Sequence, residues 1–333
     1  MIAAEISRRR FLHLAAGAVA MPAVSRFAWA QTYPSRPITV IVPFAPGGGT
    51  DVAARIITDH MARTLGQQFV VQNVVGAGGT VGSTRAMRAD PDGYTIEMGQ
   101  MGTHAAAVAF YPNLAYKPDV DFEPIGLASE YAMVIAAKKN FPPNDLNEFV
   151  AFVKTNFDKL NMSHAGVGSI FFTNCLLLNS ILGVKPTLVP FNGGAPAMVA
   201  LVGGQVDYMC TDVLGAAPQL QAGTIKAYAI AAAERSPALP NVPTTREAGL
   251  PEFQSSAWNA LFAPKSTPKP ILDKLTDALD RALDDTNVRR RLAEIANDIP
   301  DKSRRGQMAL QMLVKSEIAR WTPIIEAANI KAE

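Results

Sequence analysis

The residues of this chain best suited to chemistry are glycines, which occur in short runs between an apolar segment and a helical one. The first run, Pro43–Asp51, contains three successive glycines. Where side chains are missing, the backbone can approach a ligand closely and can adopt a positive φ. Free N–H groups at a helix start, together with the helix dipole, bind anions such as a carboxylate or phosphate. The run therefore predicts an anion site. A plain turn in which Thr50 or Asp51 caps the helix is the alternative.

Three further runs repeat this arrangement before predicted helices: Gly76–Thr80, Gly166–Ser169 and Asn192–Ala195. In open α/β sheets, ligands bind at the carboxyl ends of the strands, where strand-to-helix turns lie. Four such turns favour a ligand site lined by backbone donors. A dinucleotide site is not indicated, because the spacing is not G-x-G-x-x-G, and a P-loop is excluded because no Gly-Lys-Ser/Thr is present.

Few side chains could act as acids, bases or nucleophiles. His60 lies within a helical segment, where it is expected to be a surface or packing residue. His104 follows a strand and His164 precedes the third glycine run, so each could either contact a ligand or be a hydrogen-bonded structural residue. Asp212, at a strand end, could bind an ammonium or hydroxyl group, or could cap the next helix. There is no G-x-S-x-G and no histidine–serine–acid set at suitable spacing, so no catalytic residue is predicted.

The two cysteines, Cys175 and Cys210, show no C-x-x-C spacing and no nearby histidine pair. This argues against a zinc site, and neither a metal nor a cofactor is predicted. An oxidising compartment would permit a disulfide between the two cysteines, and two buried free thiols are the alternative.

The elements that position these residues alternate between short apolar runs and helical patterns, which predicts βαβ units and a mostly parallel sheet. A first series has strands at 38–42, 69–71 and 94–98 and helices at 50–66 and 80–89. A second series has strands at 131–137, 160–163, 187–189, 206–210 and 226–231 and helices at 144–156, 169–182 and 195–201. A loop at 236–251, a strand at 256–262 and a helical segment at 269–328, which Pro300 and Pro323 interrupt, complete the prediction.

The composition fits a globular protein of about two domains. Of 333 residues, 48% are hydrophobic and 18% are charged, which supplies a sizeable core and excludes disorder. The formal net charge is +2, but residues 1–30 contain four arginines against one glutamate, a local charge of +3 that leaves −1 for residues 31–333. Nucleic acid is therefore not an expected partner.

The first thirty residues are predicted to be an export signal. Three arginines within Ser7–Leu12 precede the apolar stretch Leu14–Val24, and Ala28–Ala30 forms an A-x-A cleavage site. Paired arginines before Phe-Leu resemble a twin-arginine signal. The apolar stretch is shorter than the roughly 18 residues that suggest a membrane span. We expect the mature chain to begin at Gln31 and to lie in the periplasm.

Five motifs, taken together in this order, point to one family. They are PFAPGGGTD (43–51), GAGGTVG (76–82), DPDGYT (90–95), GGQVD (203–207) and RSPALPNVPTTREAGL (235–250). With these motifs the chain resembles the solute-binding receptors of tripartite tricarboxylate transporters, also called the Bug family. The resemblance runs from about Tyr33 to the C-terminus.

The resemblance implies an α/β fold of the periplasmic-binding-protein type II, in which two domains, each a mixed sheet flanked by helices, close around a ligand like a flytrap. Domain 1 would comprise residues 31–129 and 256–333, and domain 2 residues 130–255. A monomer would capture a small organic carboxylate, whether a di- or tricarboxylate or an aromatic acid, and deliver it to the membrane subunits of a transporter. A receptor that signals to a membrane kinase is one alternative. A secreted hydrolase or lyase with His104 or His164 as its base is the other.

The resemblance also implies which residues contact the ligand. Backbone N–H groups and ordered waters at the turns 44–51 and 191–195 would hold a ligand carboxylate, and the remaining turns would line the cleft. Because Phe191 and Asn192 replace a more usual Tyr-Lys or Tyr-Thr pair, backbone donors would carry more of the binding. The candidate ligand-binding residues are Phe44, Ala45, Gly47, Gly48, Gly49, Thr50, Asp51, Gly79, Thr80, Thr103, His104, Ala165, Gly166, Val167, Gly168, Ser169, Phe191, Asn192, Gly193, Gly194, Ala195 and Asp212.

Overall fold

The computed structural model describes residues 33–191 and 193–328. The predicted export signal, residues 1–30, and the candidate residue Asn192 lie outside the described residues. Contacts within the chain divide it between Ser35 and Arg36, and the unit from Arg36 onward contains all of the described helices and strands.

The first series of elements follows the predicted order. It comprises β1 (Ile38–Val42), α2 (Gly49–Leu65), β2 (Phe69–Asn73), α3 (Thr80–Met87) and β3 (Thr95–Gln100). Strand β1 is a β-branched run that is buried along most of its length, as suits the centre of a sheet. Helix α2 ends at Gly66, whose φ of 68° is the left-handed conformation common after a helix. After β3 the chain forms the π-helical turn η2 (Gly102–Ala106) and the short helix α4 (Ala107–Phe110).

A single long strand then leads into the second series. Strand β4 spans Phe122–Lys138. The elements that follow it are α5 (Leu146–Asn156), β5 (Asn161–His164), α6 (Ile170–Leu182), β6 (Thr187–Pro190), α7 (Gly194–Val202), β7 (Tyr208–Asp212), α8 (Val213–Gln221) and β8 (Ile225–Ala231). Polar side chains cap several of these helices, because the first N–H groups of a helix lack intrahelical partners. Asp145 accepts from Glu148 N, and Ser169 accepts from Phe172 N.

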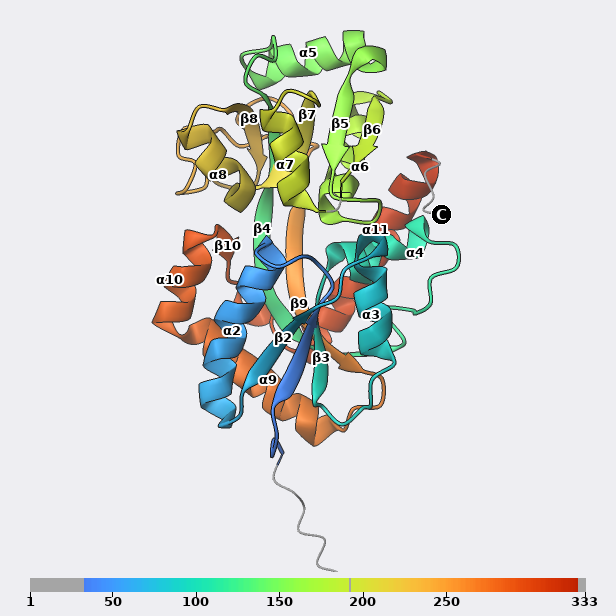
Figure 1. Cartoon of the computed structure of the whole chain (residues 1–333), viewed down its shortest axis with the longest axis vertical. Coiled ribbons are helices and arrows are strands. Elements are labelled where there is room, and N and C mark those ends of the chain that lie inside the picture. Colours follow the sequence, from blue (N-terminus) through green and yellow to red (C-terminus); the bar gives the residue numbers. More distant parts are fainter. Residues whose placement is uncertain (1–32, 192, 329–333) are drawn as a thin grey trace, which may run out of the picture. The chain divides into compact units, whose positions relative to one another are not determined.

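The C-terminal part is mostly helical. After β9 (Ser256–Pro264) come α9 (Lys269–Asp284), α10 (Thr286–Glu294), the two-residue strand β10 (Asn297–Asp298) and α11 (Gln307–Ala328). Helix α9 is amphipathic and buries Leu272, Leu275 and Leu279 at helical spacing. Helix α11 contacts β4 and η2, so the chain returns to the elements of the first series (Figure 1).

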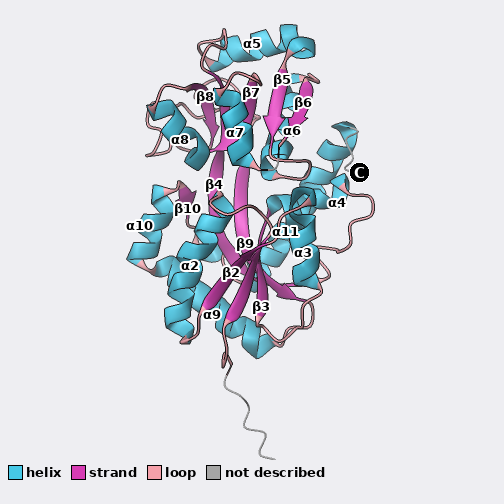
Figure 2. Ribbon diagram, in the orientation of Figure 1, coloured by secondary structure: helices cyan, strands magenta, loops and turns pink. Residues whose placement is uncertain are grey.

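All of the strands belong to one mixed sheet, in the order β2-β1-β3-β9-β4-β7-β5-β6, with β8 and β10 also paired to β4. The residues Phe122–Ala132 of β4 pair with β9, whereas Met133–Lys138 pair with β7 and β8. We call β1, β2, β3 and β10 the first strand group, and β5, β6, β7 and β8 the second strand group. Helices flank both groups, and β4 and β9 run between them (Figure 2).

This architecture confirms the predicted α/β class with mixed sheets. The residue pattern alone predicted a mostly parallel sheet, which is wrong around β9 and β4, because β9 pairs antiparallel with both β3 and β4. Pro323 was expected to interrupt the last helical segment, yet it lies within α11. Residues 36–333 form one compact unit by their contacts, so the domain boundaries at 129/130 and 255/256 stay a prediction.

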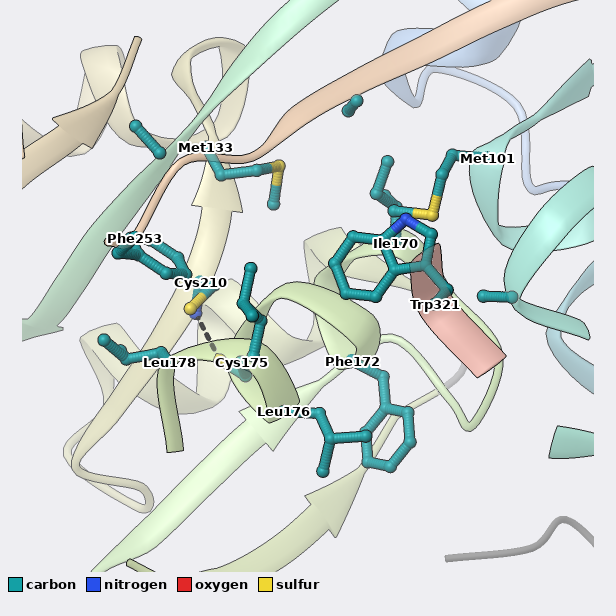
Figure 3. Close-up of a cluster of buried hydrophobic side chains, with 14 of the residues drawn as sticks. Met101, Met133, Ile170, Phe172, Cys175, Leu176, Leu178, Cys210, Phe253 and Trp321 are labelled. Atoms are coloured by element: carbon teal, nitrogen blue, oxygen red, sulfur yellow. Dashed lines mark hydrogen bonds between the residues drawn. The ribbon is translucent and has the colours of Figure 1, made fainter. Parts of the chain in front are cut away.

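The core that joins these elements includes both cysteines (Figure 3). Cys175 on α6 and Cys210 on β7 are free thiols with no exposed surface. The backbone N–H of Cys210 donates to Sγ of Cys175 over 2.8 Å. Burial raises the pKa of the Cys210 thiol well above its ordinary value, and the neighbouring Cys175 raises it further. A thiol of this kind reacts slowly, since the thiolate is the reactive species.

We therefore expect thiol titration of the protein, denatured without reductant, to count two free thiols. In the native protein both thiols are expected to resist the same reagent, because they are buried. A count of zero after denaturation would show that the pair is oxidised to a disulfide.

Candidate functional site

The first glycine turn is held in shape by Asp51, in the first turn of α2. The Asp51 carboxylate accepts hydrogen bonds from Gly47 N and from Asn73 Nδ2, each at 2.9 Å, and from the Arg55 guanidinium. Burial alone would raise the pKa of Asp51, but these hydrogen bonds outweigh it and the pKa lies below its ordinary value. The residues from Ala45 to Gly48 are exposed. The turn thus presents its main chain outward at the N-terminus of a 17-residue helix, where backbone donors favour an anion.

Two more turns of the same strand group pack against this one. A Cβ atom added to Gly79 would lie 2.7 Å from Cγ2 of Thr103 and 2.9 Å from Cζ of Phe44. Gly79 itself has a φ of 99°, which side-chain-bearing residues rarely adopt. The predicted turns at Phe44, Gly79–Thr80 and Thr103 therefore meet at the carboxyl ends of β1, β2 and β3.

A turn of the second strand group lies directly against them. A Cβ atom on Gly102 would lie 2.5 Å from the carbonyl oxygen of Gly168, and one on Gly78 would collide with the carbonyl oxygen of Val167. The Tyr111 hydroxyl donates to that same Val167 oxygen over 2.9 Å. Glycines on both sides thus allow two backbones to approach to a distance that side chains would prevent.

The fourth turn adjoins the third. The backbone N–H of Phe191 donates to the carbonyl oxygen of His164 over 2.9 Å, and a Cβ atom on Gly166 would lie 3.7 Å from the Phe191 oxygen. Gly193, with a φ of 121°, stands at the N-terminus of α7. The structure therefore brings together residues from all four predicted turns, among them Ala165, Gly194 and Ala195 as chain neighbours of these contacts.

Asp212 is the last residue of β7, in the second strand group. Its Oδ1 accepts from Gly215 N over 2.7 Å, which is the helix-capping role predicted as an alternative. Its Oδ2 faces the first glycine turn, 3.2 Å from the position of a Cβ atom on Gly49. Burial raises the pKa of this carboxyl, although the hydrogen bond from Gly215 opposes the shift. The capping bond leaves Oδ2 directed at the turn.

Sequence reasoning missed two buried polar residues beside these turns. Gln100, which ends β3, donates from Nε2 to Oγ1 of Thr50 over 3.2 Å, and Oε1 of Gln100 has no partner among the described residues. Tyr131 on β4 is close enough to Asp212 and Thr50 for both to affect its pKa, which burial raises. The rule that ligands bind at the carboxyl ends of strands could have identified Gln100, whereas no local signal marks Tyr131.

The two candidate histidines are buried and neutral. The His104 ring stacks on Phe262, with ring centroids 3.8 Å apart, and packs edge-on against Phe122. His164 accepts a hydrogen bond from Gly166 N over 3.2 Å and so helps to shape the third turn. Burial lowers the pKa of His104 to about 3 and that of His164 to about 4. Neither ring supplies a positive charge to an anion at neutral pH.

In the described part of the chain, no group of three or more histidine, cysteine or acidic residues could hold a metal ion. A hollow of about 770 Å³ lies between α3 and strands β1 to β3 and shares only Thr80 with the candidate residues. Within the described ranges, none of the helices has the length and apolarity needed to span a membrane.

Comparison with known proteins places the chain among close relatives. Residues 53–330 match the model of the tripartite tricarboxylate transporter family receptor. A protein encoded in the TAR-I ttuE-ttuC' intergenic region of Agrobacterium vitis is 40% identical over 96% of this chain and 92% of its own length. Among solved structures, MatC of Rhodopseudomonas palustris with bound malate is 52% identical, with a TM-score of 0.83 over 88% of this chain and all of that chain. R. palustris Rpa4515 with adipate is 29% identical, with a TM-score of 0.83 over 90% and 99% of the two chains.

Proposed function

Because the chain belongs to the tripartite tricarboxylate transporter family of receptors, we propose that its ligand is a C4 dicarboxylate such as malate. The protein is a solute-binding receptor for a small carboxylate rather than an enzyme. The proposal of a C4 dicarboxylate rests on the glycine turns of both strand groups, which meet in this structure. The chain is also 52% identical to a protein whose structure contains malate.

The proposed ligand contacts rely on the main chain. At the start of α2, the N–H groups of the first turn have no intrahelical partners and point toward the exposed glycines. The basic side chain beside this turn, Arg55, is already bound to Asp51. One ligand carboxylate would bind at this helix start and at the turn around Phe191–Ala195. The hydroxyl groups of Thr50, Thr80 and Ser169 already donate to protein oxygens, so the N–H groups would carry the binding.

We propose that ligand binding joins two domains, residues 31–129 with 256–333 and residues 130–255. The segments that would connect them are β4 and β9, which run between the strand groups. A ligand stabilises a closed arrangement only by contacting both sides more favourably there than in an open one. The close approach of Gly102 to Gly168 and of Gly49 to Asp212 supports a ligand that contacts both sides.

The cellular setting is part of the same proposal. Residues 1–30 have the charge and apolar pattern of a twin-arginine export signal, which supports a periplasmic receptor. It would act as a monomer and pass its ligand to the membrane subunits of a tripartite transporter.

Isothermal calorimetry tests the ligand class. We expect purified mature protein to bind malate with one site per chain and to bind succinate more weakly, because Oδ2 of Asp212 can accept a hydrogen bond from the malate hydroxyl. Adipate, citrate and benzoate complete the panel as longer, more highly charged and aromatic acids. Binding of none of these acids would contradict the carboxylate proposal, and exclusive binding of an aromatic acid would contradict the dicarboxylate part of it.

A further inference from the structure

Two buried ionisable side chains lie next to each other, one on β3 and one in the turn η2. Glu97 on β3 and His104 in η2 are both completely buried. Oε2 of Glu97 and Nε2 of His104 lie 3.8 Å apart, and neither atom has a hydrogen-bond partner in the part of the chain that the structure describes. A buried polar atom without a partner is destabilising, so two such atoms facing each other call for an explanation.

The space around the imidazole is shaped for it. A Cβ atom on Gly99 would lie 2.4 Å from Cε1 of His104 without any side-chain movement, so only glycine leaves room for the ring in this position. Phe262 stacks on one face of the imidazole at an interplanar angle of 12°. Such fixed surroundings hold the ring with Nε2 toward Glu97 and Nδ1 toward Thr103.

Hydrogen-bond donors and acceptors match along this group when Glu97 is a neutral carboxylic acid. The Ser83 hydroxyl donates to Oε1 of Glu97 over 2.6 Å. A proton on Oε2 would then be donated to Nε2 of His104, once the side chains approach by about 1 Å to hydrogen-bonding distance. The proton on Nδ1 would be donated to Oγ1 of Thr103, 3.0 Å away, and the Thr103 hydroxyl donates to the carbonyl oxygen of Gln100 over 3.1 Å.

This series of hydrogen bonds ends in η2, the turn that contacts both strand groups. Thr103 packs its methyl group against Gly79, and the preceding residue, Gly102, lies against the carbonyl oxygen of Gly168. The Tyr116 hydroxyl donates to the carbonyl oxygen of Thr103 over 2.8 Å and holds the same turn from its other side. A π-helical turn is an uncommon conformation that often occurs at functional sites, and it needs such support.

We propose that Glu97 and His104 form a buried positioning pair, in which a neutral carboxylic acid bonded to the imidazole holds Gly102 and Thr103 in the ligand-binding geometry. Both are positioning residues that act through Thr103 and do not touch the ligand. The inference rests on the proposed function, because it takes this turn to be part of the ligand site.

The ionisation of the pair gives the proposal a pH dependence. Burial raises the pKa of Glu97 from 4.5 to about 8, and the Ser83 hydrogen bond opposes the shift. The other titratable groups facing Glu97 are His104, whose pKa burial lowers to about 3, and Tyr116, whose pKa burial raises beyond the working range. Below pH 8 the acid keeps its proton and the bond to His104. Above about pH 8 that proton is lost and the carboxylate can only accept, so the imidazole proton moves from Nδ1 to Nε2. The hydrogen bond from Nδ1 to Thr103 is then lost, and the turn loses its support.

The test measures malate affinity by calorimetry from pH 6.5 to 9.5 for wild type, Glu97→Gln and Glu97→Leu. Glutamine can still accept from Ser83 and donate to Nε2 of His104, so its affinity should stay within about twofold of the low-pH wild-type value at every pH. The wild-type affinity should fall above about pH 8, by at most tenfold per pH unit. Glu97→Leu, which leaves Nε2 unpartnered, should bind about tenfold more weakly throughout. Met98→Leu, a volume-conserving change next to Glu97 on the opposite face of the strand, is the control.

Every outcome of this experiment either supports or overturns the positioning pair. An equal fall of affinity in wild type and Glu97→Gln, or wild-type affinity that is constant to pH 9.5, would overturn the positioning pair while leaving the proposed function in place. If Glu97→Leu does not fold, the comparison of wild type with Glu97→Gln alone carries the test. Wild-type protein that binds no malate or other dicarboxylate would overturn the proposed function and this inference with it.

Discussion

Replacement of Gly48 by valine is expected to abolish malate binding and to leave the fold intact. Gly48 has a φ of −74° and a ψ of 162°, an extended conformation that any residue can adopt. A Cβ atom there would meet no atom closer than the Ala45 oxygen at 3.5 Å, an ordinary contact. The valine methyl groups would instead occupy the space above the N–H groups at the start of α2, where we propose that the carboxylate binds. The valine side chain blocks access to these N–H groups without changing their positions.

Calorimetry measures the loss, which should reach at least about 100-fold in affinity, equivalent to about 2.7 kcal/mol. Thermal unfolding without ligand should be within a few degrees of wild type. Gly48→Ala, which adds only Cβ, is the matched control and should retain most of the affinity. Unchanged binding by Gly48→Val would show that the glycine turn is only structural.

Gly102→Ala is expected to weaken malate binding at least tenfold by a different route. Gly102 lies in the helical turn η2 and is not among the positive-φ glycines, so alanine suits its own backbone. The added methyl group would lie 2.5 Å from the Gly168 oxygen, which belongs to the turn before α6. The contact between the two strand groups must therefore widen, and a ligand that needs both sides loses part of its contacts.

The measurement pairs calorimetry with small-angle scattering in the presence of malate. Gly102→Ala should show a smaller ligand-induced decrease in the radius of gyration than wild type. Gly203→Ala is the control, because Gly203 has a φ of −72° and the nearest atom to an added Cβ belongs to its own helix, α7. Wild-type affinity in Gly102→Ala would contradict the close approach of the two turns as a requirement for binding.

Local sequence patterns predicted the elements that a short run of residues is enough to specify. Strand β1 has exactly the predicted bounds, since a β-branched run ending at Pro43 favours a strand and then stops it. The four glycine turns were predicted for a similarly local reason, because a positive φ or a close backbone contact needs glycine. The structure has that conformation at Gly79 and Gly193 and that contact at Gly78.

Features that depend on distant partners could not be predicted in this way. Strand β4 begins nine residues before the predicted strand, in a segment that includes Glu123, Pro124 and Gly126 and shows no regular alternation. Its pairing with β9, more than 120 residues later, overrides the local pattern and shifts register between Pro124 and Gly126. The burial of Glu97 is of the same kind, because an acid in a predicted strand gives no sign that Ser83 and His104 will enclose it.

Residue type also did not reveal which way a polar side chain would face. Asp51 and His104 were both candidates for ligand contact. The Asp51 carboxylate turns back to hold Gly47 and Asn73, and the His104 ring packs among aromatic rings behind the turn. In the structure each side chain bonds to or packs against protein groups that adjoin the proposed site. The positions of those groups are set by the fold and could not be predicted from residue type.

The exposed glycines at the start of α2 also bear on how such a protein can evolve. A donor that belongs to a side chain disappears with one codon change, but the N–H groups of a helix start remain whichever residues carry them, proline excepted. Substitutions in the turn can cover these donors but cannot delete them. On the proposed binding mode, a substitution on the opposite side, near Asp212, would change which ligand is preferred while the N–H groups for the carboxylate remain.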